Sequence, residues 1–283
     1  MAKNQWLSTL AFRNFRDKTS DLSDIYWTQQ LGADCLAEVL GTKDPDHFSV
    51  NVINSSFKHT MHPQKVSETQ TWLPTFMERN RLHILVIYTA FLETYLKEIT
   101  FYHIASLGHI TNNSETEAPL KLKPVGEAIA TPILKSSTVP DMIKYASELY
   151  EIDFGVNATE WIKLYKIRCA AAHNGGIATP KFLKAISGQP LSLRPTEYEN
   201  IGLTWDELRT AMKYGDKIAS LIDSKVSNND VRYLETEQIL RELASSKKLP
   251  DNKIIWQYFH EKYAIMLNKS EKRKVLRKFY GII

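Results

Sequence analysis

The feature that most constrains the fold is a segment that is hydrophobic on nearly every side. Between Leu82 and Leu96 apolar side chains fill almost all positions: Leu82, Ile84, Leu85, Val86, Ile87, Tyr88, Ala90, Phe91, Leu92, Tyr95 and Leu96. A helix that is apolar all round has to be covered by other elements, so this segment predicts the central helix of a bundle. The capping-box spacing of Thr75 and Glu78 predicts that the helix starts near Thr75, and we expect it to run to about Leu107.

The rest of the chain also shows helical periodicity. The alternation of apolar and polar residues that is typical of strands is almost absent, and most Pro and Gly residues fall between the periodic segments. We therefore predict an all-α fold. Further helices are expected at about Leu22–Leu40, Pro140–Glu151, Thr204–Val226, Leu234–Leu243, Asn252–Leu267 and Glu271–Tyr280, with another that starts near a capping Asn157 and stops at Gly175-Gly176.

Polar or Pro- and Gly-containing stretches separate these helices. The stretch from Gly41 to about Glu68 is predicted to be irregular, and the one from Gly108 to about Val139 to be a long connection with one short helix. Ser227–Asp230 is a predicted linker. The expected organisation is an N-terminal helical and irregular segment (1–68), a helical bundle (69–226) and an additional C-terminal basic helical subdomain (227–283).

The positive charge of the chain is concentrated near its end. The net charge is +4, and the ten residues Lys269–Lys278 hold six basic residues and one acid, a net +5, so the remainder sums to about −1. Clustered Lys and Arg side chains bind nucleic acid by releasing counterions from its phosphates. A solvated helix face is the commoner explanation of such a run, and both interpretations stay open.

Several classes of protein are not expected. No stretch approaches the roughly 20 uncharged residues that span a bilayer, and Met1–Trp6 lacks the features of a signal peptide, so we expect a cytoplasmic protein without a membrane partner. Cys35 and Cys169 are too few for a disulfide framework or a thiolate metal site. His59 and His62 lack further ligands at a useful spacing, and there is no phosphate-binding loop, so neither a metal nor a cofactor is predicted.

The candidate functional residues lie in the stretch Lys166-Ile167-Arg168-Cys169-Ala170-Ala171-Ala172-His173-Asn174-Gly175-Gly176. Arg168 is a fixed cation with two parallel donors and His173 supplies an imidazole that can act as an acid or a base, a combination suited to handling phosphate. An offset of five residues places the two about 140° apart on an ideal helix. They converge only if Arg168 reaches along the axis or the helix loosens near Ala172. A structural alternative is that His173 caps carbonyl groups at the helix end.

The Arg168-x4-His173 spacing, the Asn174-Gly175-Gly176 that follows it and the upstream helix Ala90–Ile99 together resemble the HEPN superfamily, over roughly Thr75–Val226. The resemblance implies a HEPN-like helical bundle that dimerises so that two Arg-x4-His segments face one another. Many members are metal-independent ribonucleases that act as toxins or anti-phage defence effectors. The expected function is therefore an endoribonuclease, a nuclease of the hydrolase class, that cleaves RNA by 2′-OH transesterification at a homodimer interface.

The resemblance also implies partners and site residues. The expected partners are RNA, either tRNA or mRNA, a second copy of the chain, and an antitoxin or defence-system protein. Arg168 is expected to hold the phosphate and His173 to act as base or acid. Asn174 is a candidate donor or a helix terminator. Glu93 is a carboxylate in an apolar helix and is a candidate catalytic residue near the site. The alternative is that Glu93 forms an ordinary ion pair with Lys97, one helical turn later.

One position departs from the family pattern. Family members thought to be active commonly have a polar residue directly after the arginine, whereas this chain has Cys169. This departure concerns catalysis more than the fold. The alternative function is therefore a non-catalytic HEPN-like dimerising module that binds a protein partner or a nucleotide.

Overall fold

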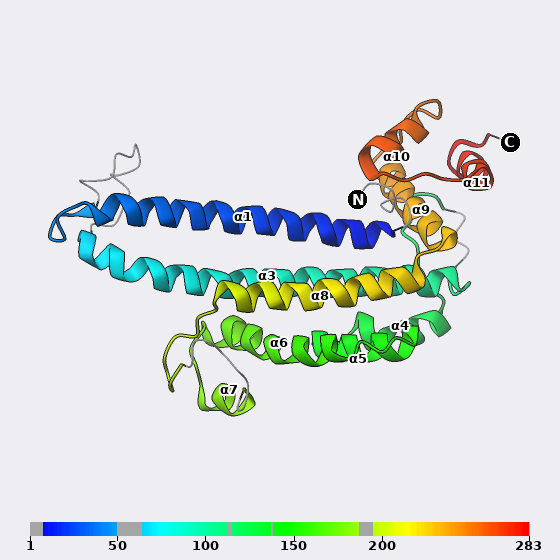
Figure 1. Cartoon of the computed structure of the whole chain (residues 1–283). Coiled ribbons are helices and arrows are strands. Elements are labelled where there is room, and N and C mark those ends of the chain that lie inside the picture. The colour runs from blue at the N-terminus through cyan, green and yellow to red at the C-terminus, as the bar shows by residue number, and fades with distance from the viewer. Residues whose placement is uncertain (1–7, 50–63, 112–114, 137, 187–194, 283) are drawn as a thin grey trace. The chain divides into compact units, whose positions relative to one another are not determined.

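The computed structural model describes residues 8–49, 64–111, 115–136, 138–186 and 195–282. Within these ranges the chain forms ten helices and no strands (Figure 1), which confirms the predicted all-α class. The helices are α1 (Leu10–Gly41), α3 (Val66–Ser106), α4 (Pro124–Leu134), α5 (Val139–Tyr150), α6 (Val156–Asn174), α7 (Pro180–Ala185), α8 (Trp205–Val226), α9 (Asn229–Ser245), α10 (Ile255–Tyr263) and α11 (Lys269–Tyr280).

The described residues fall into two compact units. The first unit takes its residues from 1–17, 91–158 and 215–283, and the second from 18–90 and 159–214. Helices α1, α3, α6 and α8 contribute to both units, because the divisions at 17/18, 90/91, 158/159 and 214/215 fall inside these helices. The boundaries expected at 68/69 and 226/227 stay predictions.

In the second unit, α3 contacts three other helices. Tyr88 of α3 is fully buried, donates from its hydroxyl to the carbonyl of Met212 in α8 at 2.8 Å, and packs its ring 5.7 Å from that of Trp161 in α6. Arg81 of α3 donates to the hydroxyl of Tyr26 in α1 at 3.0 Å. The apolar segment therefore lies where its composition predicted, among other helices of the bundle.

The predicted start of α3 is wrong. The helix begins at Val66, before the predicted capping box, and Pro74 lies inside it. At the real start, the amide of Lys65 donates to the carboxylate of Glu68 at 3.0 Å. The end at Ser106 agrees with the predicted end near Leu107, and Val66–Glu68, the last residues of the stretch predicted to be irregular, are helical.

The predicted start of α8 is confirmed. The amide of Thr204 donates to the carboxylate of Glu207 at 2.9 Å, and the amide of Glu207 donates to the hydroxyl of Thr204 at 3.3 Å, so both halves of the capping box are present. At α6 the helix begins at Val156, which agrees with the predicted start near Asn157, but the predicted capping role of Asn157 is wrong. There Asn157 lies within the helix and its side-chain amide donates to the carbonyl of Phe154 at 3.0 Å.

The predicted linker at Ser227–Asp230 is also corrected. Asn228 is the N-cap of α9, and its side chain accepts a hydrogen bond from the amide of Val231 at 2.9 Å. Helix α9 therefore follows α8 almost directly. The short helix expected in the connection is α4, and the expected helix after it is α5.

In the first unit, two buried carboxylates hold the start of α1. Glu235 of α9 accepts hydrogen bonds from the amides of Leu10 and Ala11 at 2.8 and 2.9 Å. Asp223 of α8 accepts from the amide of Thr9 at 3.1 Å. These acceptors satisfy amides that have no partner within the helix. Burial raises the pKa of Glu235 to about 7, against the opposing effect of the two amides, and also raises the pKa of Asp223.

This arrangement predicts that stability depends on pH. The pKa of Glu235 in the fold lies above the ordinary value of 4.5, so the native state binds more protons than the unfolded chain between pH 4.5 and about pH 7. The free energy of unfolding should therefore fall as the pH rises through this window, by roughly 1–3 kcal/mol. Urea unfolding at several pH values measures this slope. Glu235→Gln should remove this part of the slope, and an unchanged slope in that variant would contradict the assignment.

The C-terminal helices of the first unit share a small core. Its buried members are Leu240, Ile255, Phe259, Ile265, Leu267 and Val275. Beside this core, Arg241 of α9 is 1% exposed and donates to the carboxylate of Glu237 at 2.8 Å and to the carbonyl of Ala118 at 2.9 Å. Lys278 of α11 donates to the same carboxylate at 2.6 Å. Arg241 thereby joins α9 to the connection before α4.

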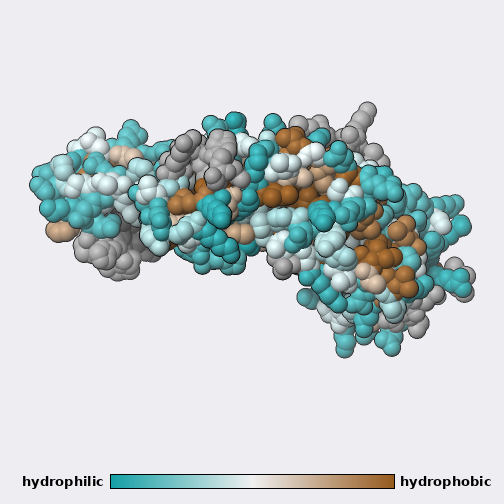
Figure 2. Space-filling model, turned by 90° about the horizontal axis from the view of Figure 1, so that it is seen from below, coloured by the Kyte–Doolittle hydropathy of each residue, from teal (hydrophilic) through white to brown (hydrophobic). Residues whose placement is uncertain are grey.

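The surface of the protein carries both hydrophobic and hydrophilic side chains (Figure 2). Figure 2 shows one face of the molecule, on which hydrophobic side chains gather in separate patches among hydrophilic ones. Exposed apolar side chains include Leu31 of α1, Val125 of α4 and Met266 of the α10–α11 connection. None of the helices in the described ranges has the length and hydrophobicity of a membrane span.

Candidate functional site

The helix that carries the Arg-x4-His spacing is regular to its end. Helix α6 continues to Asn174, where the chain turns through Gly175 and Gly176 with φ angles of 58° and 77°. Residues with side chains rarely adopt these positive angles, so the paired glycines end the helix as predicted. The loosening near Ala172 that would bring Arg168 and His173 together is absent from α6.

Arg168 and His173 consequently lie on different sides of α6. The guanidinium of Arg168 lies 5.4 Å from the ring centre of Tyr165, one turn earlier. Its Nε atom is buried and has no hydrogen-bond partner within the described residues. His173 is exposed and lines a cavity to which Arg168 does not contribute. A single chain therefore does not assemble both groups at one place.

The cavity beside His173 has a volume of about 560 Å³ and lies between α6 and α7. Its lining residues are Lys166, Cys169, Ala170, His173 and Asn174 from α6, with Thr179, Lys181, Phe182 and Ala185 from α7 and the residue before it. The α6 members follow the spacing i, i+3, i+4, i+7 and i+8, which places them on one face of the helix. The lining contains two lysines and a histidine and no carboxylate, so an anionic ligand is favoured there.

Helix α7, which closes one side of this cavity, was not predicted. Its start is fixed by Thr179, whose hydroxyl accepts from the amide of Phe182 at 3.2 Å, and by Pro180 in the first turn. Phe182 is buried, and the Nζ of Lys166 donates to the carbonyl of Ala185 at 2.8 Å. The pair Thr179-Pro180 is a helix-start signal that the sequence reasoning missed.

The other two predicted site residues have different surroundings. Asn174 is the last residue of α6 and lines the cavity as an exposed side chain. Glu93 belongs to the other compact unit, where its carboxylate accepts from the Nζ of Lys97 at 2.7 Å. The helix pair that was the alternative for Glu93 is therefore formed.

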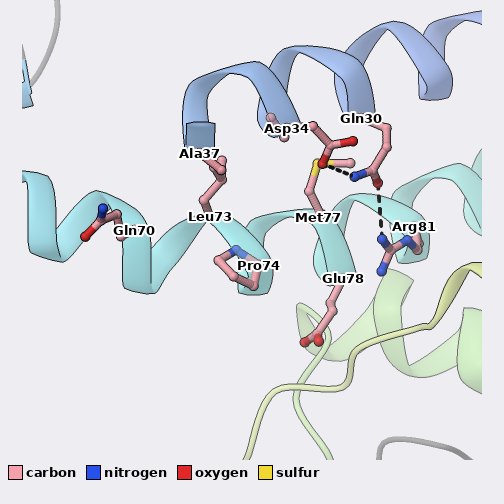
Figure 3. A pocket seen from close by; sticks show the side chains of 10 residues that line it. Gln30, Asp34, Ala37, Gln70, Leu73, Pro74, Met77, Glu78 and Arg81 are labelled. Atoms are coloured by element: carbon pink, nitrogen blue, oxygen red, sulfur yellow. Dashed lines mark hydrogen bonds between the residues drawn. The ribbon is translucent and has the colours of Figure 1, made fainter. Parts of the chain in front are cut away.

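A second cavity lies between α1 and α3 in the second unit (Figure 3), with a volume of about 380 Å³. In it, Arg81 donates to the side-chain oxygen of Gln30 at 3.2 Å, and the amide of Gln30 donates to Asp34 at 2.8 Å. Its lining includes the carboxylates of Asp34 and Glu78. The two acids make it less suited to phosphate than the α6–α7 cavity, which is our candidate site.

Metal ligands are not gathered in the part of the chain that the structure describes, where no group of three or more His, Cys, Asp or Glu side chains is placed to hold an ion. His59 and His62 lie outside the described residues.

No protein-family model, curated protein or solved structure is significantly similar to this chain.

Proposed function

We propose that this protein is a metal-independent endoribonuclease of the HEPN type. The observation that carries the proposal is that His173 lies exposed at an open cavity whose lining contains Lys166, Lys181 and no carboxylate. A histidine beside lysines is suited to bind a phosphodiester and to move a proton at it. The Arg-x4-His spacing, on which the resemblance rests, connects this chemistry to RNA.

The reaction would be a transesterification within the RNA. A base removes the proton of a ribose 2′-hydroxyl, and its oxygen forms a bond to the adjacent phosphorus. The bond from phosphorus to the 5′-oxygen breaks, and an acid protonates that oxygen, which leaves a 2′,3′-cyclic phosphate and a 5′-hydroxyl. These two roles require two proton-transfer groups, and a homodimer would supply them as His173 and His173 of the partner subunit.

A dimer would also account for the position of Arg168. Within one chain its guanidinium lies on a different side of α6 from His173, and its Nε is buried without a partner among the described residues. In the proposed dimer, Arg168 of the partner subunit would hold the phosphate that His173 acts upon, by two parallel donors. The proposed substrate is tRNA or mRNA, and a toxin or defence role would require an antitoxin or defence-system partner.

A non-catalytic dimerising module is the second candidate. It is favoured by Cys169, which follows Arg168 where active family members commonly have a polar residue and which lines the cavity itself. In this case the cavity would bind a nucleotide or a protein segment without cleaving RNA.

Inducible expression in a bacterial host separates the two candidates. An active ribonuclease should slow growth and degrade cellular RNA, and His173→Ala should remove both effects. His47→Ala, which changes an exposed histidine outside the cavity, is the matched control and should behave like the wild type. Equal growth and intact RNA with the wild type and His173→Ala would favour the binding module.

A further inference from the structure

The six basic residues of α11 divide into two sets. Three of them are paired within the first unit: Lys272 with the ring of Trp256 at 5.4 Å, Lys274 with the ring of Tyr233 at 5.4 Å, and Lys278 with the carboxylate of Glu237 at 2.6 Å. These three cations contribute to the packing of α11 against α9 and α10. Their charges therefore interact with an aromatic ring or a carboxylate of the first unit.

The other three basic residues, Lys269, Arg273 and Arg277, are exposed and make no ion pair or ring contact with described residues. They recur every four residues, so each lies about 6 Å further along the helix and about 40° around it from the last. This places them opposite the buried Val275 and Glu271. We refer to Lys269, Arg273 and Arg277 as the α11 stripe.

The surroundings of the α11 stripe strengthen its positive field. Residues 227–283 contain twelve Lys and Arg and seven Asp and Glu, a net charge of +5. Three of the seven acids, Glu235, Glu237 and Glu271, are buried, against one of the twelve bases, Arg241. The charge that this segment presents to solvent is therefore more positive than its composition alone indicates, and a polyanion is the complementary partner.

The packing of α11 favours nucleic acid over a lipid surface. A helix that lies on a membrane presents an apolar face to the lipid, opposite its basic face. In α11 that face is occupied, because Val275 is fully buried in the core shared with α9 and α10. What remains outside is a row of cations that winds slowly around the exposed side of α11, which is suited to successive phosphates of a nucleic acid strand.

We propose that the α11 stripe binds the phosphate backbone of single-stranded RNA. The choice of RNA rests on the proposed function. Lys269, Arg273 and Arg277 contact phosphates and do not read the bases, so they raise affinity for RNA of any sequence. Binding through three such contacts is sensitive to salt.

The test measures binding separately from cleavage. Full-length protein carrying His173→Ala is titrated, in EDTA, into a fluorescent unstructured RNA of about 20 nucleotides, at salt concentrations from roughly 50 to 200 mM. Replacing all three stripe residues by Gln should weaken binding by roughly tenfold or more. It should also reduce the slope of log affinity against log salt by about 2, because each lost phosphate contact removes about 0.7 from a single-strand slope.

A charge-matched control removes three lysines from elsewhere on the surface. Lys43→Gln, Lys144→Gln and Lys225→Gln change exposed side chains outside α11, lower the net charge by the same amount, and should leave affinity and slope nearly unchanged. Circular dichroism checks that both triple variants are folded.

Three results would overturn the proposal: equal binding by the stripe variant and its parent, equal weakening by both triple variants, or binding to duplex DNA or phosphatidylserine vesicles in preference to RNA. The same experiments can refute the proposed ribonuclease without refuting RNA binding by the α11 stripe. RNA bound through the stripe by a wild-type protein that cleaves no RNA would refute the ribonuclease and leave this inference standing.

Discussion

Replacing His173 by alanine is expected to lower the rate of RNA cleavage by roughly 10²–10⁴-fold, the usual contribution of a general acid or base. In the proposed dimer the change removes both proton-transfer groups, because each subunit supplies one. The fold should be unaffected, since His173 is exposed near the end of α6. Cleavage of a labelled RNA under single-turnover conditions measures the rate, and circular dichroism and light scattering measure folding and dimerisation.

The control for this prediction is Asn174→Ala, which removes the neighbouring exposed side chain from the same cavity. If Asn174 only terminates the helix, its loss should change the rate by a few-fold at most, whereas a donor to the phosphate would cost more. A His173→Ala protein that cleaves as fast as the wild type would show that His173 does not act on the substrate.

Replacing Arg241 by methionine is expected to destabilise the protein by roughly 3–5 kcal/mol, the usual cost of removing one partner from a buried ion pair. Arg241 is 1% exposed, and its loss removes one of the two cations paired with the buried carboxylate of Glu237, which keeps the half-buried Lys278 of α11. The carbonyl of Ala118 would lose a donor as well. Urea unfolding with a constant m-value measures the free energy change.

An exposed ion pair of the same kind provides the comparison. Arg209 pairs with Asp206 at 3.0 Å with both side chains more than half exposed, so Arg209→Met should change stability by about 0.5 kcal/mol or less. Equal effects of the two substitutions would mean that Arg241 does not compensate a buried charge.

The fold class was predictable because its signal is local. The apolar run from Leu82 to Leu96 and the capping box at Thr204 each depend on residues close together in sequence, and both expectations hold. The start of α1, predicted near Leu22 and found at Leu10, was signalled only in part by nearby residues. The hydroxyl of Thr9 is a local cap that accepts from the amide of Phe12 at 3.2 Å, but the amides of Thr9 and Leu10 donate to Asp223 and Glu235, more than 200 residues away.

The misplaced start of α3 has a different cause. A hydroxyl three residues before a carboxylate is a frequent pattern, and Thr75 and Glu78 show it in the interior of a helix that tolerates Pro74. Nothing in the pattern itself separates a true cap from such an internal match. The correct start uses another acid at the same spacing, Glu68 after Lys65.

The candidate site was only partly predictable. The spacing of Arg168 and His173 predicted that a regular helix would separate them, and α6 is regular. The cavity, in contrast, depends on α7, which is positioned by pairing between distant segments: the amide of Ala178 donates to the carbonyl of Glu199 at 2.8 Å. The roles of Lys166 and Lys181 in the lining follow from that pairing and not from any local motif.

The central claim is that this protein cleaves RNA by a 2′-OH transesterification that uses His173, and the chemistry of the product tests it most directly. Wild-type protein is incubated with total RNA and tRNA in EDTA, and the 3′ ends of the fragments are analysed. We expect 2′,3′-cyclic phosphate ends with the wild type and intact RNA with His173→Ala. Intact RNA with both proteins, or fragments that end in a 3′-hydroxyl, would contradict the claim.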